Sequence, residues 1–121
     1  MINIDKIVNE ISRLYQTDKR SRFMKPHPLN AMDLWFRSNE YLKSAEIINQ
    51  DPSHHWLAVS QLKGQAIELI IKACIVAENT PIPHEHDLIK LFKKAQSLGY
   101  KLNEKEFAAI VHLNHIYFED L

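Results

Sequence analysis

Apolar residues recur at steps of three and four along most of the chain, a spacing that is typical of amphipathic helices. Five segments show this spacing, over residues 3–21, 31–48, 52–78, 88–98 and 103–121. The third segment is apolar over more than half of its circumference, as expected of a helix in the middle of a bundle. The pattern therefore predicts helices throughout.

Residues that favour helix starts stand before two of these segments. Asp51-Pro52 combines an N-cap residue with a proline suited to the first helical position, so we expect the third helix to begin there. Asn103 and Glu106 have the spacing of a capping box, which predicts the start of the last helix.

The stretch PIPHEHDLIKLF (81–92) joins the third and fourth helices. Its two prolines favour an extended linker, because proline lacks the backbone N–H and constrains the residue before it. The acidic residues suit a helix start, and either His86 or Asp87 marks the expected boundary. Gly99 stands where this helix should end.

The chain contains only two glycines and five prolines, fewer turn residues than strands and hairpins require. We therefore expect an all-α fold, an antiparallel up-and-down bundle of about five helices. We expect residues 1–121 to form one domain, with the helix over 3–21 as an accessory element. The predicted core includes Trp35, Leu62, Ile70, Leu88, Leu91, Val111 and Tyr117.

Composition narrows the function classes. Lysine plus arginine balance aspartate plus glutamate at 15 each, so no global basic field attracts nucleic acid. Cys74 is the only cysteine, and its apolar surroundings predict an inert core residue. The start resembles no signal peptide, and the most apolar stretch is too short to span a bilayer. We expect a cytoplasmic protein with no membrane association.

Two histidine groups are candidate metal ligands. His84 and His86 flank Glu85, and His112 and His115 lie three positions apart on one helix face. Zinc requires about four converging ligands, and neither spacing supplies them. We therefore expect no metal site, with these histidines at surfaces and helix boundaries.

Glu68 and Lys72 interrupt the apolar third helix at a spacing that favours an ion pair. We expect them to form a solvent-facing seam. The alternative is a buried pair with Gln61 or Gln65, one turn away, as a further partner. Gly64 in mid-helix costs about 1 kcal/mol relative to alanine, which a close helix crossing would justify.

Several short motifs occur in an order that resembles the HEPN domain family. They span about 31–117 and read LWFRSNEYLKSA (34–45), LKGQAIELIIKA (62–73), HDLIKL (86–91), LGYKL (98–102) and LNHIY (113–117). The resemblance implies a compact helical bundle. Many members of the family are metal-independent ribonucleases, commonly toxins or defence proteins.

The active site of those ribonucleases is an arginine followed four to six residues later by a histidine on the last helix. The last predicted helix here contains no arginine. The resemblance therefore favours a non-catalytic module that binds a partner protein, a nucleotide or RNA, in a prokaryotic toxin–antitoxin or defence context. No cofactor is expected.

The motifs also suggest which residues meet a ligand. The expected ligand-binding residues are Glu68, Lys72, His86 and Asp87. The alternative function is a metal-independent ribonuclease in which Lys63 or Lys72 replaces the arginine beside His112 or His115. Metal-free cleavage would need such a cation close to the histidine.

Aromatic residues near the ends of the apolar stripes predict a homodimer. Five short helices cannot enclose all of them on one inward seam, and the set comprises Trp56, Phe92, Phe107, Tyr117 and Phe118. A remaining apolar patch usually marks an interface, and two-fold pairing would bury it. The family resemblance points the same way, because HEPN bundles often pair across their later helices.

Overall fold

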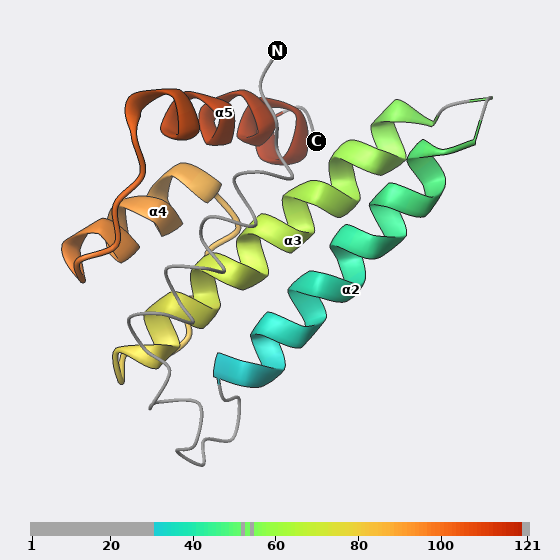
Figure 1. The fold of residues 1–121 in the computed structure, drawn as a ribbon. Coiled ribbons are helices and arrows are strands. Elements are labelled where there is room, and N and C mark those ends of the chain that lie inside the picture. Colours follow the sequence, from blue (N-terminus) through green and yellow to red (C-terminus); the bar gives the residue numbers. More distant parts are fainter. Residues whose placement is uncertain (1–30, 52, 54, 120–121) are drawn as a thin grey trace.

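The computed structural model describes residues 31–119 apart from 52 and 54, and within this part the chain forms helices and no strand (Figure 1). The elements are α2 (Ala31–Asn49), α3 (Trp56–Ala77), α4 (Leu88–Ser97), α5 (Glu104–Asn114) and the π-helical turn η2 (His115–Glu119). The all-α prediction is confirmed. The described part holds four α-helices, and the helix expected over 3–21 lies outside the described residues.

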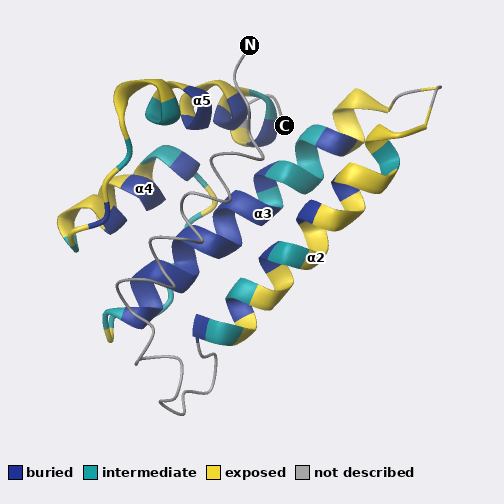
Figure 2. Cartoon of the chain, in the orientation of Figure 1, coloured by how far each residue is buried: buried dark blue, intermediate teal, exposed yellow. Residues whose placement is uncertain are grey.

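The long helices α2 and α3 form an antiparallel hairpin, and α4 and α5 pack on the other side of α3 (Figure 1). The buried face of α2 consists of Ala31, Leu34, Ser38, Leu42 and Ala45. Ser38 Oγ donates a 2.7 Å hydrogen bond to the backbone oxygen of Ala66 across this contact. From Ala66 to Ala77 every residue of α3 is buried, so α3 is the centre of the bundle (Figure 2).

The start of α3 differs from the prediction. The helix begins at Trp56, with His55 as its N-cap, rather than at Pro52. The Asp51 carboxylate instead accepts hydrogen bonds from Ser53 N at 2.9 Å and Ser53 Oγ at 2.7 Å. This short turn satisfies the capping group locally, and the helix starts only after it.

The boundaries of the two later helices agree with the sequence. Asp87 caps α4, and its Oδ1 accepts from the backbone N–H of Ile89 at 3.0 Å and of Lys90 at 3.4 Å. Gly99, with a φ of 103°, follows the end of α4 in the left-handed region that glycine tolerates. After α3, Glu78 is the C-cap and the next residue, Asn79, has a φ of 59°.

The capping box of α5 is also confirmed. Asn103 Oδ1 accepts from Glu106 N at 2.8 Å, and Glu106 Oε1 accepts from Asn103 N at 2.9 Å. The inward face of α5 and η2 consists of Ala109, Ile110, Leu113, Asn114 and Tyr117.

Most of the predicted core residues lie inside. Ile70, Leu88, Leu91 and Tyr117 are buried, as is Cys74, whereas Trp35 and Leu62 are half-buried. Val111 is 40% exposed, so its placement in the core was wrong. Consecutive helix residues diverge by about 100°, and the inward face of α5 follows Ala109, Ile110, Leu113 and Asn114, which leaves Val111 at the solvent side.

Searching the described residues for a helix long and apolar enough to cross a membrane finds none.

Candidate functional site

A buried carboxylate, that of Glu68, lies at the centre of the polar contacts within the bundle. Its residue is only 2% exposed. Lys72 Nζ donates to Glu68 Oε2 at 2.8 Å, and His86 Nδ1 lies 3.0 Å from the same oxygen. Tyr117 Oη approaches Glu68 Oε1 at 2.7 Å. These groups come from α3, the α3–α4 linker and η2, so one side chain ties three segments together.

Gly64 explains how Tyr117 reaches this carboxylate. A Cβ atom added at Gly64 would collide with Cδ1, Cγ and Cβ of Tyr117, so the tyrosine lies directly against the backbone of α3. The crossing lies in the π-helical turn that follows α5, where the wider turn shifts the phase of the helix. The close crossing that the mid-helix glycine suggested is therefore present.

The Tyr117 hydroxyl has two acceptors within reach. It lies 2.6 Å from Gln65 Oε1 and 2.7 Å from Glu68 Oε1, yet it carries a single proton. The ionised carboxylate is the stronger acceptor, so the proton belongs on the Glu68 side. Exchanging the amide O and N of Gln65, a 180° rotation of the side-chain amide, would let its NH₂ donate to the phenol oxygen.

The contacts within this group shift the pKa values of Glu68 and Tyr117. Burial alone raises the pKa of the Glu68 carboxyl, but hydrogen bonds from Lys72, Tyr117 and His86 outweigh it and leave the pKa below its ordinary value. Burial, together with the hydrogen bond to Glu68 and its negative charge, raises the pKa of Tyr117. The carboxylate therefore stays ionised and the phenol stays protonated at neutral pH.

His86 is the only strongly exposed member of the group. Its side chain is 67% exposed, whereas the side chains of Glu68 and Lys72 are 3% and 8% exposed. Its backbone N–H donates to Glu85 Oε2 at 3.2 Å, which fixes the linker just before α4. The imidazole thus lies at the surface over a buried carboxylate.

The four predicted ligand-binding residues divide into two kinds. Glu68 and Lys72 are buried and bonded to each other, so the expected solvent-facing seam was wrong. The buried alternative holds, with Gln65 as the further neighbour of the group. Asp87 caps α4 and also accepts from Asn114 Nδ2 at 3.0 Å. His86 alone of the four presents most of its side chain to solvent.

The residues of the alternative ribonuclease differ in burial. Lys72 is 6% exposed and its ammonium contacts Glu68, whereas His112 and His115 are exposed on α5 and η2. Lys63 is half-buried on α3. An ammonium engaged in a buried ion pair is not available as a substitute cation beside an exposed imidazole.

Sequence analysis did not single out the lysines of α4. Lys90, Lys93 and Lys94 are exposed, on the side opposite the buried Leu88, Leu91, Phe92 and Ala95. The helix contains no acidic residue, and its N-cap, Asp87, directly follows His86. The signal was present in LIKLFKKAQS (88–97), whose polar face carries only lysine, serine and neutral amide groups. His86 and these three lysines form what we term the α4 basic surface.

Asn114 is a second residue that sequence analysis missed. It is fully buried, accepts from Leu88 N at 2.8 Å through Oδ1 and donates to Asp87 through Nδ2. These two bonds fix the start of α4, and with it His86, to α5. The only sequence feature that indicated its burial was its place among the apolar positions of the last helix.

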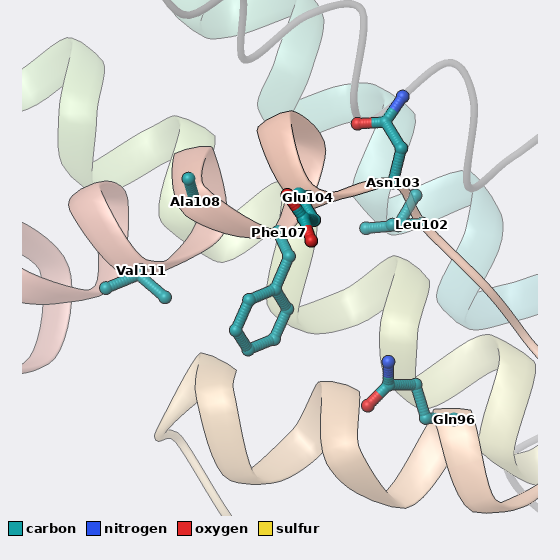
Figure 3. A pocket seen from close by; sticks show the side chains of 7 residues that line it. All are labelled: Gln96, Leu102, Asn103, Glu104, Phe107, Ala108 and Val111. Carbon is teal, nitrogen blue, oxygen red and sulfur yellow. The ribbon is translucent and has the colours of Figure 1, made fainter.

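An open hollow of about 460 Å³ lies along α5 and the loop before it, with Gln96 of α4 at its edge. Its lining residues are Gln96, Leu102, Asn103, Glu104, Phe107, Ala108 and Val111. Figure 3 shows Phe107 projecting from α5 toward Gln96 of α4. This hollow accounts for the exposure of Val111.

Within the described part of the chain, no three histidine, cysteine, aspartate or glutamate side chains are placed to share a metal ion. In particular, His84 and His86 do not form such a group with Glu85 and Asp87.

Comparison with protein families gives one match, to the HEPN domain, over residues 31–120. Neither the comparison with curated proteins nor that with solved structures gives a match.

Proposed function

The chain belongs to the HEPN domain family, and on that premise we propose that it is a module that binds RNA or a ribonucleotide without cleaving it. Membership in the family supports a nucleotide- or RNA-related role in general. The α4 basic surface supports a location for the contact.

The observation that carries the proposal is the charge of the α4 basic surface. Three lysines on one helix face, with no acidic side chain on that helix, attract phosphate groups and release their counterions. Lys90 Nζ lies 3.8 Å from Glu85 Oε1, so the positive charge of Lys90 is partly balanced by the Glu85 carboxylate. The principal phosphate contacts that we propose are therefore Lys93 and Lys94. The phosphate contacts would hold the ligand along α4, and His86 would contact the ligand near the start of this helix.

The absence of cleavage rests on the missing cation. The last arginine in the sequence is Arg37 on α2, so α5 and η2 carry none beside His112 or His115. Of the two candidate substitutes, Lys72 is bonded to Glu68 inside the bundle and Lys63 is half-buried on α3. A metal-independent transition state at phosphorus needs such a cation near the acid or base, so binding is favoured over catalysis.

A titration of labelled single-stranded RNA at several salt concentrations tests the proposal. The variant Lys93→Gln, Lys94→Gln should bind more weakly, and its log–log salt slope should fall by about 0.7 for each lost contact. The matched control is Arg37→Gln, Lys43→Gln, which removes two exposed charges from α2 on the far side of α3. It should leave both values unchanged.

Other outcomes would redirect the assignment. Equal weakening by both double variants would mean that only net charge matters, and the α4 basic surface would be rejected. Failure of RNA and ribonucleotides to bind, with capture of a protein instead, would favour a protein-interaction module. RNA cleavage in chelator that is abolished by His112→Ala or His115→Ala would favour the ribonuclease alternative.

A further inference from the structure

The imidazole of His86 is held by one nitrogen and exposed at the other. Nδ1 lies 3.0 Å from the buried Glu68 Oε2, while the side chain as a whole is 67% exposed. The two nitrogens are separated by one ring carbon and point in widely different directions, so Nε2 is directed away from Glu68, on an imidazole that is mostly exposed.

The partner fixes which nitrogen carries the proton. An ionised carboxylate accepts hydrogen bonds and donates none, so Nδ1 must be the protonated nitrogen. Lys72 and Tyr117 both donate to Glu68, so its carboxylate stays ionised and is held in position beside the His86 imidazole. The neutral imidazole therefore presents a lone pair at Nε2, and no N–H, to whatever approaches from solvent.

A lone-pair acceptor selects for ligands that bring a donor. The phosphate groups of a nucleic acid have none to offer and would be bound by Lys93 and Lys94 instead. Amino groups on base edges are common to RNA and DNA. The ribose 2′-hydroxyl is the one donor present in RNA and absent from DNA.

We propose that His86, positioned by Glu68, accepts a hydrogen bond from a ribose 2′-hydroxyl, so that the α4 basic surface prefers ribonucleotides to deoxyribonucleotides. This inference rests on the proposed function and deepens it. The shared chemistry is the ribose of an RNA strand or of a free ribonucleotide. His86 is the contacting residue, and Glu68 is a positioning residue that sets the tautomer.

Binding of four ligands at about pH 8, where an ordinary imidazole is neutral, tests the preference. They are an RNA oligonucleotide, its 2′-deoxy counterpart with uracil retained, a ribonucleoside triphosphate and its 2′-deoxy form. One neutral hydrogen bond should give a preference of about three- to tenfold for the ribose ligand. A preference confined to the oligonucleotide identifies RNA as the ligand, and one confined to the triphosphate identifies a free ribonucleotide.

Variants assign the preference to His86. His86→Ala should reduce the ribose-to-deoxyribose ratio to about one. His84→Ala is the matched control, because it removes an exposed histidine from the same linker, and it should keep the ratio. A ratio that survives His86→Ala overturns the inference.

The tautomer can be read without any ligand. Two-bond ¹H–¹⁵N correlations of the histidine rings should show His86 with its proton on Nδ1, assigned by loss of the signal in His86→Ala. A proton on Nε2 overturns the inference.

The two proposals fail in different ways. Equal affinity of the wild-type protein for ribose and deoxyribose ligands rejects the reading of the 2′-hydroxyl and leaves nucleic-acid binding intact. No binding of any of the four ligands rejects both.

Discussion

Glu68 retains its negative charge inside the bundle because three donors replace the water it loses. Desolvation of a carboxylate costs several kcal/mol, and an incompletely bonded pair would destabilise the fold. Lys72, Tyr117 and His86 each lie within 3.0 Å of its oxygens, so both oxygens have partners. The result is a carboxyl group with a pKa below 4.5, its ordinary value, despite its burial.

This lowered pKa predicts extra sensitivity to acid. A group whose pKa is lower in the folded state stabilises the protein above its unfolded pKa and loses that contribution as pH falls through the folded pKa. We expect the wild-type free energy of unfolding in urea to fall between about pH 7 and about pH 3.5 by more than that of Glu68→Gln, Lys72→Met. Replacing both partners avoids leaving a buried unpaired charge.

The exposed carboxylate of Glu46 on α2 supplies the control. Glu46→Gln should show the same acid-dependent loss as the wild-type protein. If the double variant loses as much stability as the wild type over this pH range, Glu68 is not the source of the sensitivity.

At the scale of the elements, the contact of α3 with η2 depends on Gly64. Alanine there should gain about 1 kcal/mol of helix propensity, yet its methyl group would overlap the Tyr117 ring and Cβ. Overpacking of this kind costs about 1–3 kcal/mol, so we expect Gly64→Ala to reduce the free energy of unfolding. Urea denaturation at neutral pH measures the change.

A double-mutant cycle separates the two effects. In a Tyr117→Ala background the space is open, and Gly64→Ala should become stabilising by about 1 kcal/mol. Stabilisation by Gly64→Ala in the wild-type background would contradict the close crossing of α3 and η2.

Helix boundaries could be predicted where capping is local and has a single solution. Asp87 and Asn103 bond to backbone groups two or three residues away, and both predictions were confirmed. Asp51 had a competing partner in Ser53, which the Asp-Pro signal alone could not exclude, so the predicted start of α3 was four residues early.

The candidate site was only half predictable. The spacing of Glu68 and Lys72 revealed the pair, but its burial depends on Tyr117 and His86, which lie 49 and 18 positions from Glu68. Such pairings follow from the packing of the bundle and from a π-helical turn that no local sequence pattern predicted. The lysine face of α4 could have been found from periodicity alone.

At the scale of the whole molecule, the outer side of α5 and η2 exposes apolar side chains among polar ones such as Lys105 and His112. Phe107 and Val111 lie four positions apart and line the hollow beside α4. Phe107 is half-buried, Val111 is 40% exposed, and Phe118 in η2 is 38% exposed. Phe92 and Tyr117, two of the aromatic residues that suggested an interface, are buried instead. The exposed large apolar side chains of the described residues form two groups. One lies on α2 and at the start of α3, and it comprises Phe36, Tyr41, Ile47, Trp56 and Leu57. The other comprises Val111 and Phe118 on α5 and η2, where Val111 lines the hollow beside α4.

We predict a homodimer that pairs through this outer face of α5. A two-fold contact would place the hollow and Val111 of one protomer against those of its partner, and a stable dimer needs at least about 1,000 Å² of buried surface. Sedimentation equilibrium at micromolar concentration should give twice the chain mass of 14.2 kDa.

Val111→Glu should shift the mass toward the monomer, because it introduces like charges at the symmetric contact, whereas Ile47→Glu on the exposed face of α2 should not. A monomeric wild-type protein would reject the dimer, and dissociation by Ile47→Glu alone would move the interface to α2.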